Sequence, residues 1–374
     1  MENQQKSKKF NAIFITYLVV LTAFVAVRIC SGFGVFAKLG NTIVIDIVST
    51  SIIQIGVLFL IPFLLYKLLL KQKPKQIFKD FGYKKINFKA ILICLGIGIL
   101  AFFINLFVAS FFNFILSYTG YSSGAGSSVG GETSYTVVNF LVEVVTVAIL
   151  PALCEEFVHR GLVLRGTADT VGYKKAIIIS SLLFGLMHLN IQQFFYATIL
   201  GIFMGFLVSM TRSIWPAVIV HFCNNFINVY LNFAEYNGLP GGNFSQLLNS
   251  IASQNIILFF FVSIAIVTVC VLGIIWLVKR LFIETSINSY GKVFEDIENK
   301  IRTGENQNMT DQEVIGAFKD VVFPNLKSPK SLIDFLVADG KNYSKISLRY
   351  KISMIACLFL GTVITIFTFI WGVV

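Results

Sequence analysis

Two adjacent glutamates, Glu155 and Glu156, lie inside a long apolar segment, and Arg160 follows the second by four residues. A charged side chain at the centre of a membrane helix costs roughly 2.5–3.5 kcal/mol on insertion scales, so such residues usually face a polar cavity or a partner. Residues four apart share one face of a helix, whereas neighbours point about 100° apart. Glu156 can therefore pair with Arg160, which leaves Glu155 as the carboxylate free to act as a general base.

Two of the three histidines, His188 and His221, also lie within apolar segments, and Asn225 follows His221 by about one helical turn. Counted from the nearest basic residue at a helix end, Glu155, His188 and His221 lie about 15, 20 and 14 Å deep at 1.5 Å per residue. The sequence therefore predicts that a carboxylate and two imidazoles meet at similar depth.

Each of these residues, taken singly, also fits a structural role. Glu156 and Arg160 fit an ion pair near a helix end, and His188 fits a buried histidine of the core. The polar stripe that contains His221 and Asn225 fits hydrogen bonding between membrane helices. The functional interpretation depends on the set rather than on any one member.

The elements that must position these residues are membrane helices. The 374 residues are 56% hydrophobic and only 13% charged, against about 25% charged in soluble domains. Apolar runs of membrane-spanning length recur along the chain. We expect an all-α, polytopic helix bundle with about nine spans, at residues 10–27, 43–70, 90–117, 135–164, 176–189, 192–210, 214–233, 255–278 and 353–374.

The charge distribution predicts the orientation of the bundle. Only Arg28 and Lys38, of 30 basic residues, fall on one face of the predicted topology. The positive-inside rule then places the N-terminus and residues 279–352 in the cytoplasm and the C-terminus outside the cell membrane. The same asymmetry explains the net charge of +11 without a nucleic-acid partner. The six cysteines include no CxxC and are expected to be free thiols.

Three motifs together resemble the signatures of the CAAX-protease/CPBP (Abi) family of intramembrane endopeptidases. They are Glu155-Glu156-x-x-x-Arg160, Phe184-x-x-x-His188 and His221-x-x-x-Asn225. Their order, spacing and placement on successive membrane helices match the family over about residues 135–232. Each motif alone is weakly specific, whereas the three in order are strongly specific.

The resemblance implies hydrolysis of a peptide bond in a membrane cavity reached from the cytoplasmic side. The substrate would be a peptide or a membrane-associated protein. Glu155 and His188 would position and deprotonate the attacking water, and His221 and Asn225 would donate hydrogen bonds to the oxyanion. Glu156 and Arg160 would hold the helix geometry.

Four regions follow from this interpretation. Residues 1–134 hold N-terminal membrane helices and a basic cytoplasmic loop, and residues 135–278 form the membrane protease core. Residues 279–352 are expected to be a helical cytoplasmic insertion, and residues 353–374 a last membrane helix.

A metal requirement is left open by the sequence. One glutamate and two histidines are also the ligand set of a catalytic zinc, here Glu155, His188 and His221. The chain lacks the HExxH motif that would favour zinc. We expect a metal-independent enzyme with no cofactor.

Two other classes of protein fit part of the pattern. A transporter or proton pathway could use intramembrane acids such as Asp46 and Glu143, although the chain shows no paired inverted repeat. A catalytically inactive relative could act as a scaffold or bacteriocin-immunity protein through residues 279–352.

Overall fold

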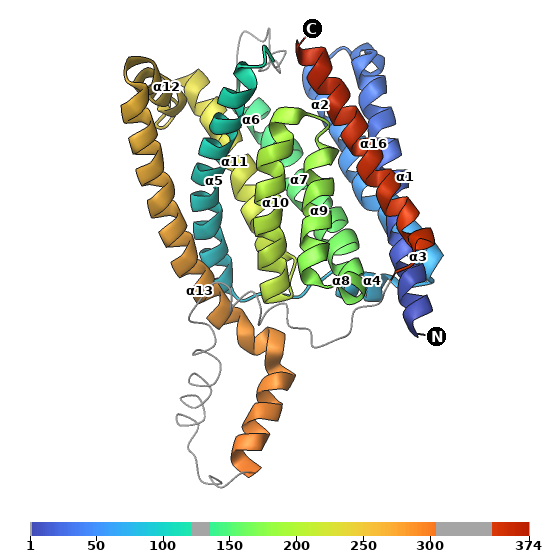
Figure 1. Cartoon of the computed structure of the whole chain (residues 1–374). Coiled ribbons are helices and arrows are strands. Elements are labelled where there is room, and N and C mark those ends of the chain that lie inside the picture. The colour runs from blue at the N-terminus through green and yellow to red at the C-terminus, as the bar shows by residue number, and fades with distance from the viewer. Residues whose placement is uncertain (1, 122–134, 304–345, 374) are drawn as a thin grey trace.

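The computed structural model describes residues 2–121, 135–303 and 346–373, and its regular elements in these ranges are all helices (Figure 1). The predicted all-α polytopic bundle is confirmed. Within the described ranges, seven helices are long and apolar enough to cross a membrane. They are Asn3–Gly32, Thr42–Leu70, Phe88–Ser117, Val137–Val171, Ile191–Thr211, Ile257–Thr285 and Leu348–Trp371.

The two other expected spans correspond to helices α9 (Tyr173–Met187) and α11 (Trp215–Asn237), which run beside α10 within the bundle (Figure 1). Helix α9 has 15 residues, which extend about 22 Å and are too few to cross the apolar core of a bilayer alone. Helix α11 has 23 residues, but His221 and several asparagines lower its hydropathy. The segments that carry the two histidines of the motifs are therefore the least typical membrane helices.

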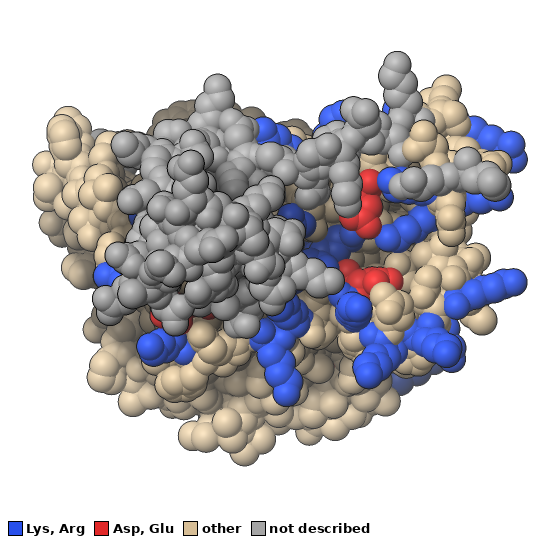
Figure 2. Space-filling model, turned by 90° about the horizontal axis from the view of Figure 1, so that it is seen from below, with Lys and Arg blue, Asp and Glu red and all other residues tan. Residues whose placement is uncertain are grey.

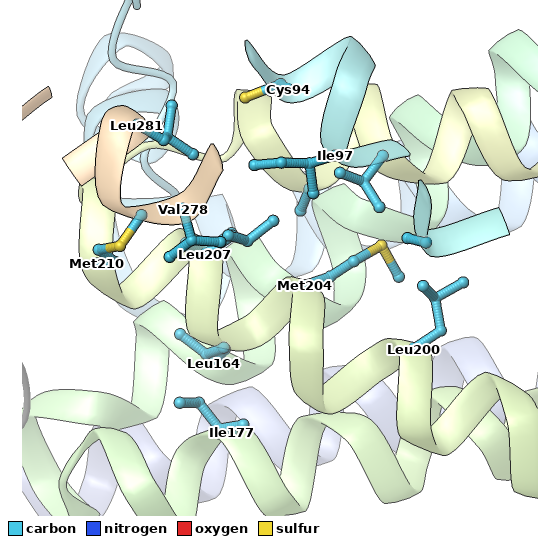
Figure 3. Packing of buried hydrophobic residues seen from close by; sticks show 14 of the residues in the cluster. Cys94, Ile97, Leu164, Ile177, Leu200, Met204, Leu207, Met210, Val278 and Leu281 are labelled. Atoms are coloured by element: carbon cyan, nitrogen blue, oxygen red, sulfur yellow. The ribbon is translucent and has the colours of Figure 1, made fainter. Parts of the chain in front are cut away.

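The bundle is assembled from pairs of long helices (Figure 1). Helix α10 (Ile191–Thr211) packs along α9, and α5 (Phe88–Ser117) packs along both α11 and α13 (Ile256–Thr303). The first helix, α1 (Glu2–Gly32), packs along the last, α16 (Leu348–Val373). Residues far apart in sequence thus enclose a common core, in which Ile97, Leu164 and Met204 are buried with side chains of α9 and α13 (Figure 3).

The helix that carries the two glutamates is α-helical but contains two π-helical segments. Helix α6 (Val137–Glu143) continues into a π-helical segment, Val144–Ile149, and helix α7 (Leu150–Glu156) continues into another, Phe157–Arg165, before α8 (Gly166–Val171). A third π-helical segment, Ile52–Leu60, separates α2 (Thr42–Ser51) from α3 (Ile61–Leu70). Such segments alter the direction in which side chains point, and they are frequent at functional sites.

The two ends of the bundle differ in charge. One end, called the lysine-rich end here, holds the N-terminus, the short helix α4 (Pro74–Asp80) and α8. Lys and Arg side chains gather on this face (Figure 2). The opposite, lysine-poor end holds the short helix α12 (Phe244–Gln254) and the C-terminal end of α16.

The predicted insertion begins inside a continuous helix. Helix α13 passes residue 278 without interruption and continues to Thr303, the last described residue of this range. Residues 304–345 of the insertion lie outside the described residues, so the expectation that they are helical stays a prediction.

Candidate active site

A cavity of about 600 Å³ opens between the helices of the bundle. Its lining includes Glu155, His188, His221 and Asn225, which come from α7, the end of α9 and α11. The fold therefore brings these four residues of the three motifs to one cavity. Glu156 and Arg160 lie behind the wall, and neither side chain is exposed.

The cavity extends from Glu155 toward the lysine-poor end. Helix α1 contributes Phe24 and Arg28, close to its end at Gly32, and α5 contributes residues from Phe102, at its middle, to Asn113. On the helices of Glu155 and His221, the further lining residues Thr146, Val147, Pro151, Asn224, Asn225 and Asn228 also lie on the lysine-poor side of these two residues. The family resemblance implied a route from the cytoplasmic side, which we expect to be the lysine-rich end. The cavity does not extend toward that end.

Glu155 is the carboxylate that reaches the cavity. Its side chain is 14% exposed, and its Oε2 lies 3.9 Å from Nε2 of His221. Its Oε1 accepts a hydrogen bond of 3.2 Å from Nε2 of Gln54. Gln54 belongs to the second membrane span, and no motif in the sequence indicated that it is part of the site.

Glu156 is the carboxylate that holds the wall together. Its Oε1 lies 2.8 Å from Nη1 of Arg160 and 2.9 Å from Nδ1 of His221. The predicted pairing with Arg160 is present, and the link to His221 is an addition to it. Arg160 also donates to the carbonyl of Gly201 on α10 at 3.1 Å, and its guanidinium lies 4.5 Å from the ring centre of Phe184. The buried pair thus connects its own helix to three others, α9, α10 and α11.

This arrangement determines how the imidazole of His221 is used. An ionised carboxylate can only accept hydrogen bonds. With Glu156 ionised by its pairing with Arg160, Nδ1 of His221 carries the hydrogen of their shared bond. The other nitrogen, Nε2, then faces Glu155 at the cavity.

Phe184 is central to the site, although its motif suggested no role for it. Its ring centre lies 5.0 Å from His159, 5.2 Å from His188 and 5.6 Å from His221, each time in an edge arrangement. His188 packs against Phe184 and lines the cavity. Its side chain makes no hydrogen bond to Glu155 among the described residues. Phe184 therefore separates the histidines and sets their spacing.

His159, which the sequence left without a role, is a fully buried structural residue. Its Nδ1 lies 2.8 Å from the carbonyl of Glu155, and its Nε2 lies 3.3 Å from the hydroxyl of Tyr17 on α1. Ser180 on α9 donates to the His159 carbonyl at 2.7 Å. These bonds fix the Glu155 turn against α1 and α9.

Asn225 has a structural partner as well as a place on the cavity wall. Its Nδ2 donates to the carbonyl of Val147 at 2.9 Å. That carbonyl belongs to the π-helical segment Val144–Ile149, which ends just before Pro151. Asn224 and Asn105 continue the amide chain, at 3.2 and 3.0 Å. Asn225 thus ties α11 to the segment of the glutamate helix that precedes Pro151.

The three residues considered as zinc ligands are not arranged as a ligand set. Within the part of the chain that the structure describes, no three His, Cys, Asp or Glu side chains are grouped so that they could hold a metal ion. His221 directs Nδ1 to Glu156 and Nε2 to Glu155, while His188 packs against Phe184. A metal at Glu155, His188 and His221 would require these side chains to move.

The fold and the cavity together define a class: a multi-pass helical membrane protein with a carboxylate, two imidazoles and an amide at an internal polar site. Residues 137–227 match the family model described as type II CAAX prenyl endopeptidase Rce1-like. The matched segment contains every residue of the three motifs. The resemblance seen in the sequence is confirmed over these residues.

Neither the curated proteins nor the solved structures include a significant match to this chain. The Rce1-like domain supports the general assignment of an intramembrane endopeptidase that acts on a peptide or protein substrate within the membrane.

Proposed function

We propose that the protein is an intramembrane endopeptidase in which Glu155 activates water, and that Glu155, His188, His221 and Asn225 are its catalytic residues. One observation carries the proposal: these four residues line a single cavity inside the Rce1-like domain. A water held against Glu155 and His188 would attack the carbonyl carbon of a peptide bond in the cavity. Its proton would pass to Glu155 and then to the leaving amine as the C–N bond breaks.

Glu155 is suited to this role because it is the carboxylate of the pair that makes no ion pair with Arg160. Arg160 serves Glu156, and the nearest cationic group to Glu155 would be His221, at 3.9 Å. Gln54 supports one carboxylate oxygen through a neutral hydrogen bond, which leaves lone pairs on both oxygens for water. A general base of this kind contributes typically about 10²–10⁴-fold to a rate.

His221 and Asn225 would stabilise the oxyanion. Asn225 has a second amide hydrogen besides the one used on Val147. His221 can donate through Nε2 only when both ring nitrogens carry hydrogen, because Nδ1 is engaged by Glu156. Two carboxylates and one arginine meet at this site, so a protonated His221 would make the group electrically neutral. Removing one oxyanion donor costs about 2.7–4 kcal/mol in a soluble protease.

We propose that the reaction needs no metal. Both nitrogens of His221 already face carboxylates, and this supports direct activation of water by Glu155. Treatment with 1,10-phenanthroline should leave cleavage unchanged. Loss of cleavage that added Zn²⁺ restores would replace the proposal with a zinc mechanism in which Glu155, His188 and His221 are the ligands.

We also propose an orientation in the cell membrane. The N-terminus and residues 279–352 would lie in the cytoplasm and the C-terminus outside. The gathering of Lys and Arg on the end that holds the N-terminus supports this assignment (Figure 2).

The test of the proposed function is comparative peptidomics of cells that carry the wild-type protein or the Glu155→Ala variant. We expect specific peptide products that disappear in Glu155→Ala. The matched control is Glu143→Gln, which alters an acid of the same span that bonds to Tyr135 and does not line the cavity. The absence of any product that depends on Glu155 would refute the protease.

A proton pathway gives a different result in the same set of variants. Wild-type protein in liposomes would then conduct protons, and Glu155→Gln and Glu143→Gln would both reduce the flux. An endopeptidase should show no such flux and should lose cleavage only with Glu155.

A further inference from the structure

The cavity of the proposed protease is closed at one end and polar at the other, and these ends differ in charge. From this difference we infer that the substrate reaches Glu155 from the lysine-poor, extracytoplasmic side. The substrate class would be peptide segments that lie outside the cytoplasm, next to or within the outer part of the membrane. The inference rests on the proposed function for its substrate, but the access route itself can be tested without any activity.

The lysine-rich end is closed first by aromatic packing. Phe157, immediately after the glutamate pair, has no exposed surface. Its ring centre lies 4.9 Å from Phe59, 4.9 Å from Phe81 and 6.3 Å from Tyr83. Tyr83 in turn meets Trp215, at the start of α11, at 5.8 Å. Burial raises the pKa of Tyr83 well above its usual range, so the hydroxyl remains uncharged in this layer.

A set of hydrogen bonds to backbone carbonyls, called the backbone clasp here, lies on the lysine-rich side of the aromatic layer. Arg165 donates to the carbonyls of Asp80 and Arg212, at 2.9 and 3.3 Å. In the other direction, the amide of Ile214 donates to the carbonyl of Gly82 at 2.8 Å. The loop after α4 is thereby tied to the lysine-rich ends of both helices that carry the glutamates and His221.

Gly82 allows this clasp to fit closely. Its φ of +85° is in the left-handed region, and a Cβ there would lie 2.6 Å from Cδ of Arg165. Ser213 adds a bond of 2.6 Å to the carbonyl of Lys84. A peptide approaching from this end would have to separate the loop, the aromatic layer and the Glu156–Arg160 pair.

The lysine-poor end offers a polar entrance instead. Arg28, Asn113 and Asn228 all line the cavity and are exposed, and they come from three different helices, α1, α5 and α11. Deeper on the same wall are Asn105, Asn224 and Gln54. Amides provide both donors and acceptors for an extended peptide backbone. In an apolar bundle, such a lining is expected where water and a peptide enter.

The route can be tested by cysteine labelling in intact cells. Cys30 is the only exposed cysteine in the described ranges, so Cys30→Ser gives a background with little reactivity. Ala109→Cys places a thiol on the cavity wall and Asn228→Cys places one at the entrance. Lys75→Cys, on the exposed surface of α4, is the matched position at the lysine-rich end.

A membrane-impermeant, charged thiosulfonate should label Ala109→Cys and Asn228→Cys before the cells are opened. Lys75→Cys should react only after permeabilisation. If Ala109→Cys also reacts only after permeabilisation, or if Lys75→Cys reacts in intact cells, the proposed route is overturned.

Products of the enzyme provide the second readout. Peptides that depend on Glu155 should come from extracytoplasmic segments of their parent proteins. Products that map to cytoplasmic segments would overturn the route and leave the protease intact. Correct labelling without any product that depends on Glu155 would refute the protease and leave the route intact.

Discussion

The two halves of the site, on either side of the Glu155–Glu156 peptide bond, are built in opposite ways. Toward the lysine-rich end, Glu156, Arg160, His159 and Phe157 have no exposed surface. Toward the lysine-poor end, Glu155 and a series of amides face a cavity of about 600 Å³. The difference indicates a division of roles, in which the closed half fixes the position of His221 and the open half performs chemistry on a substrate.

The largest expected effect is on catalysis and comes from the open half. Glu155→Gln keeps the size of the side chain but removes the base, so cleavage should fall about 10²–10⁴-fold. Melting temperature in detergent should stay unchanged, because Glu155 forms no buried ion pair with Arg160. The measurement is the rate of cleavage of a substrate identified by peptidomics. Cleavage near the wild-type rate would remove Glu155 from the mechanism.

The closed half should respond in both stability and activity. Glu156→Gln leaves Arg160 buried without its counter-ion, which typically costs about 3–5 kcal/mol. We expect a lower melting temperature together with slower cleavage, since His221 loses a charged partner at Nδ1.

The double variant Glu156→Gln/Arg160→Met is the control for this effect. It removes both charges, so it should recover much of the stability without recovering the activity. An unchanged melting temperature in Glu156→Gln alone would show that the closed half does not depend on this pair.

Sequence alone predicted the parts of this site that depend on local spacing. The bundle follows from apolar run lengths, and the Glu156–Arg160 contact follows from an i,i+4 relation. The contacts of Glu156 with His221 and of Gln54 with Glu155 join residues 65 and 101 positions apart. They depend on how each helix is rotated about its axis, and the π-helical segments change that rotation.

One feature had a signal in the sequence that is visible only in retrospect. Pro151 cannot donate a backbone N–H within its helix, and Asn225 is a polar side chain that donates to the carbonyl of Val147 in the preceding turn. No such signal indicated whether the cavity extends toward the lysine-rich or the lysine-poor end. Glu155 and His221 lie at similar depth, and this alone does not show at which end the helices diverge.

A smaller effect on stability and cleavage should follow from a substitution at the contact between α9 and α10. A Cβ on Gly185 would lie 2.1 Å from Oγ1 of Thr198 and 2.8 Å from the carbonyl oxygen of Phe194. Gly185→Ala should therefore separate the helices, at a cost of about 1–3 kcal/mol. His188, three residues on, should move with α9 and cleavage should slow.

Gly56→Ala is the matched control, because a Cβ at Gly56 has nothing within 4 Å. It should leave both melting temperature and cleavage close to wild type. Equal effects of the two substitutions would mean that close packing of α9 on α10 does not position His188.

The smallest effect separates orientation of Glu155 from its chemistry. Gln54→Met keeps the length of the side chain but removes the donor to Oε1 of Glu155. We expect cleavage to fall about tenfold, equivalent to about 1.4 kcal/mol. Stability should hardly change, because the variant also removes Oε1 of Gln54, a buried oxygen with no partner among the described residues.

The comparison for Gln54→Met is Gln192→Met, at another cavity amide whose side chain makes no hydrogen bond to Glu155 among the described contacts. It should cleave at close to the wild-type rate if Gln54 acts by orienting the carboxylate. If both variants slow cleavage equally, the polarity of the cavity matters rather than one bond. Gln54 of the second span would then contribute to the polar wall of the open half, but it would not orient the carboxylate of Glu155.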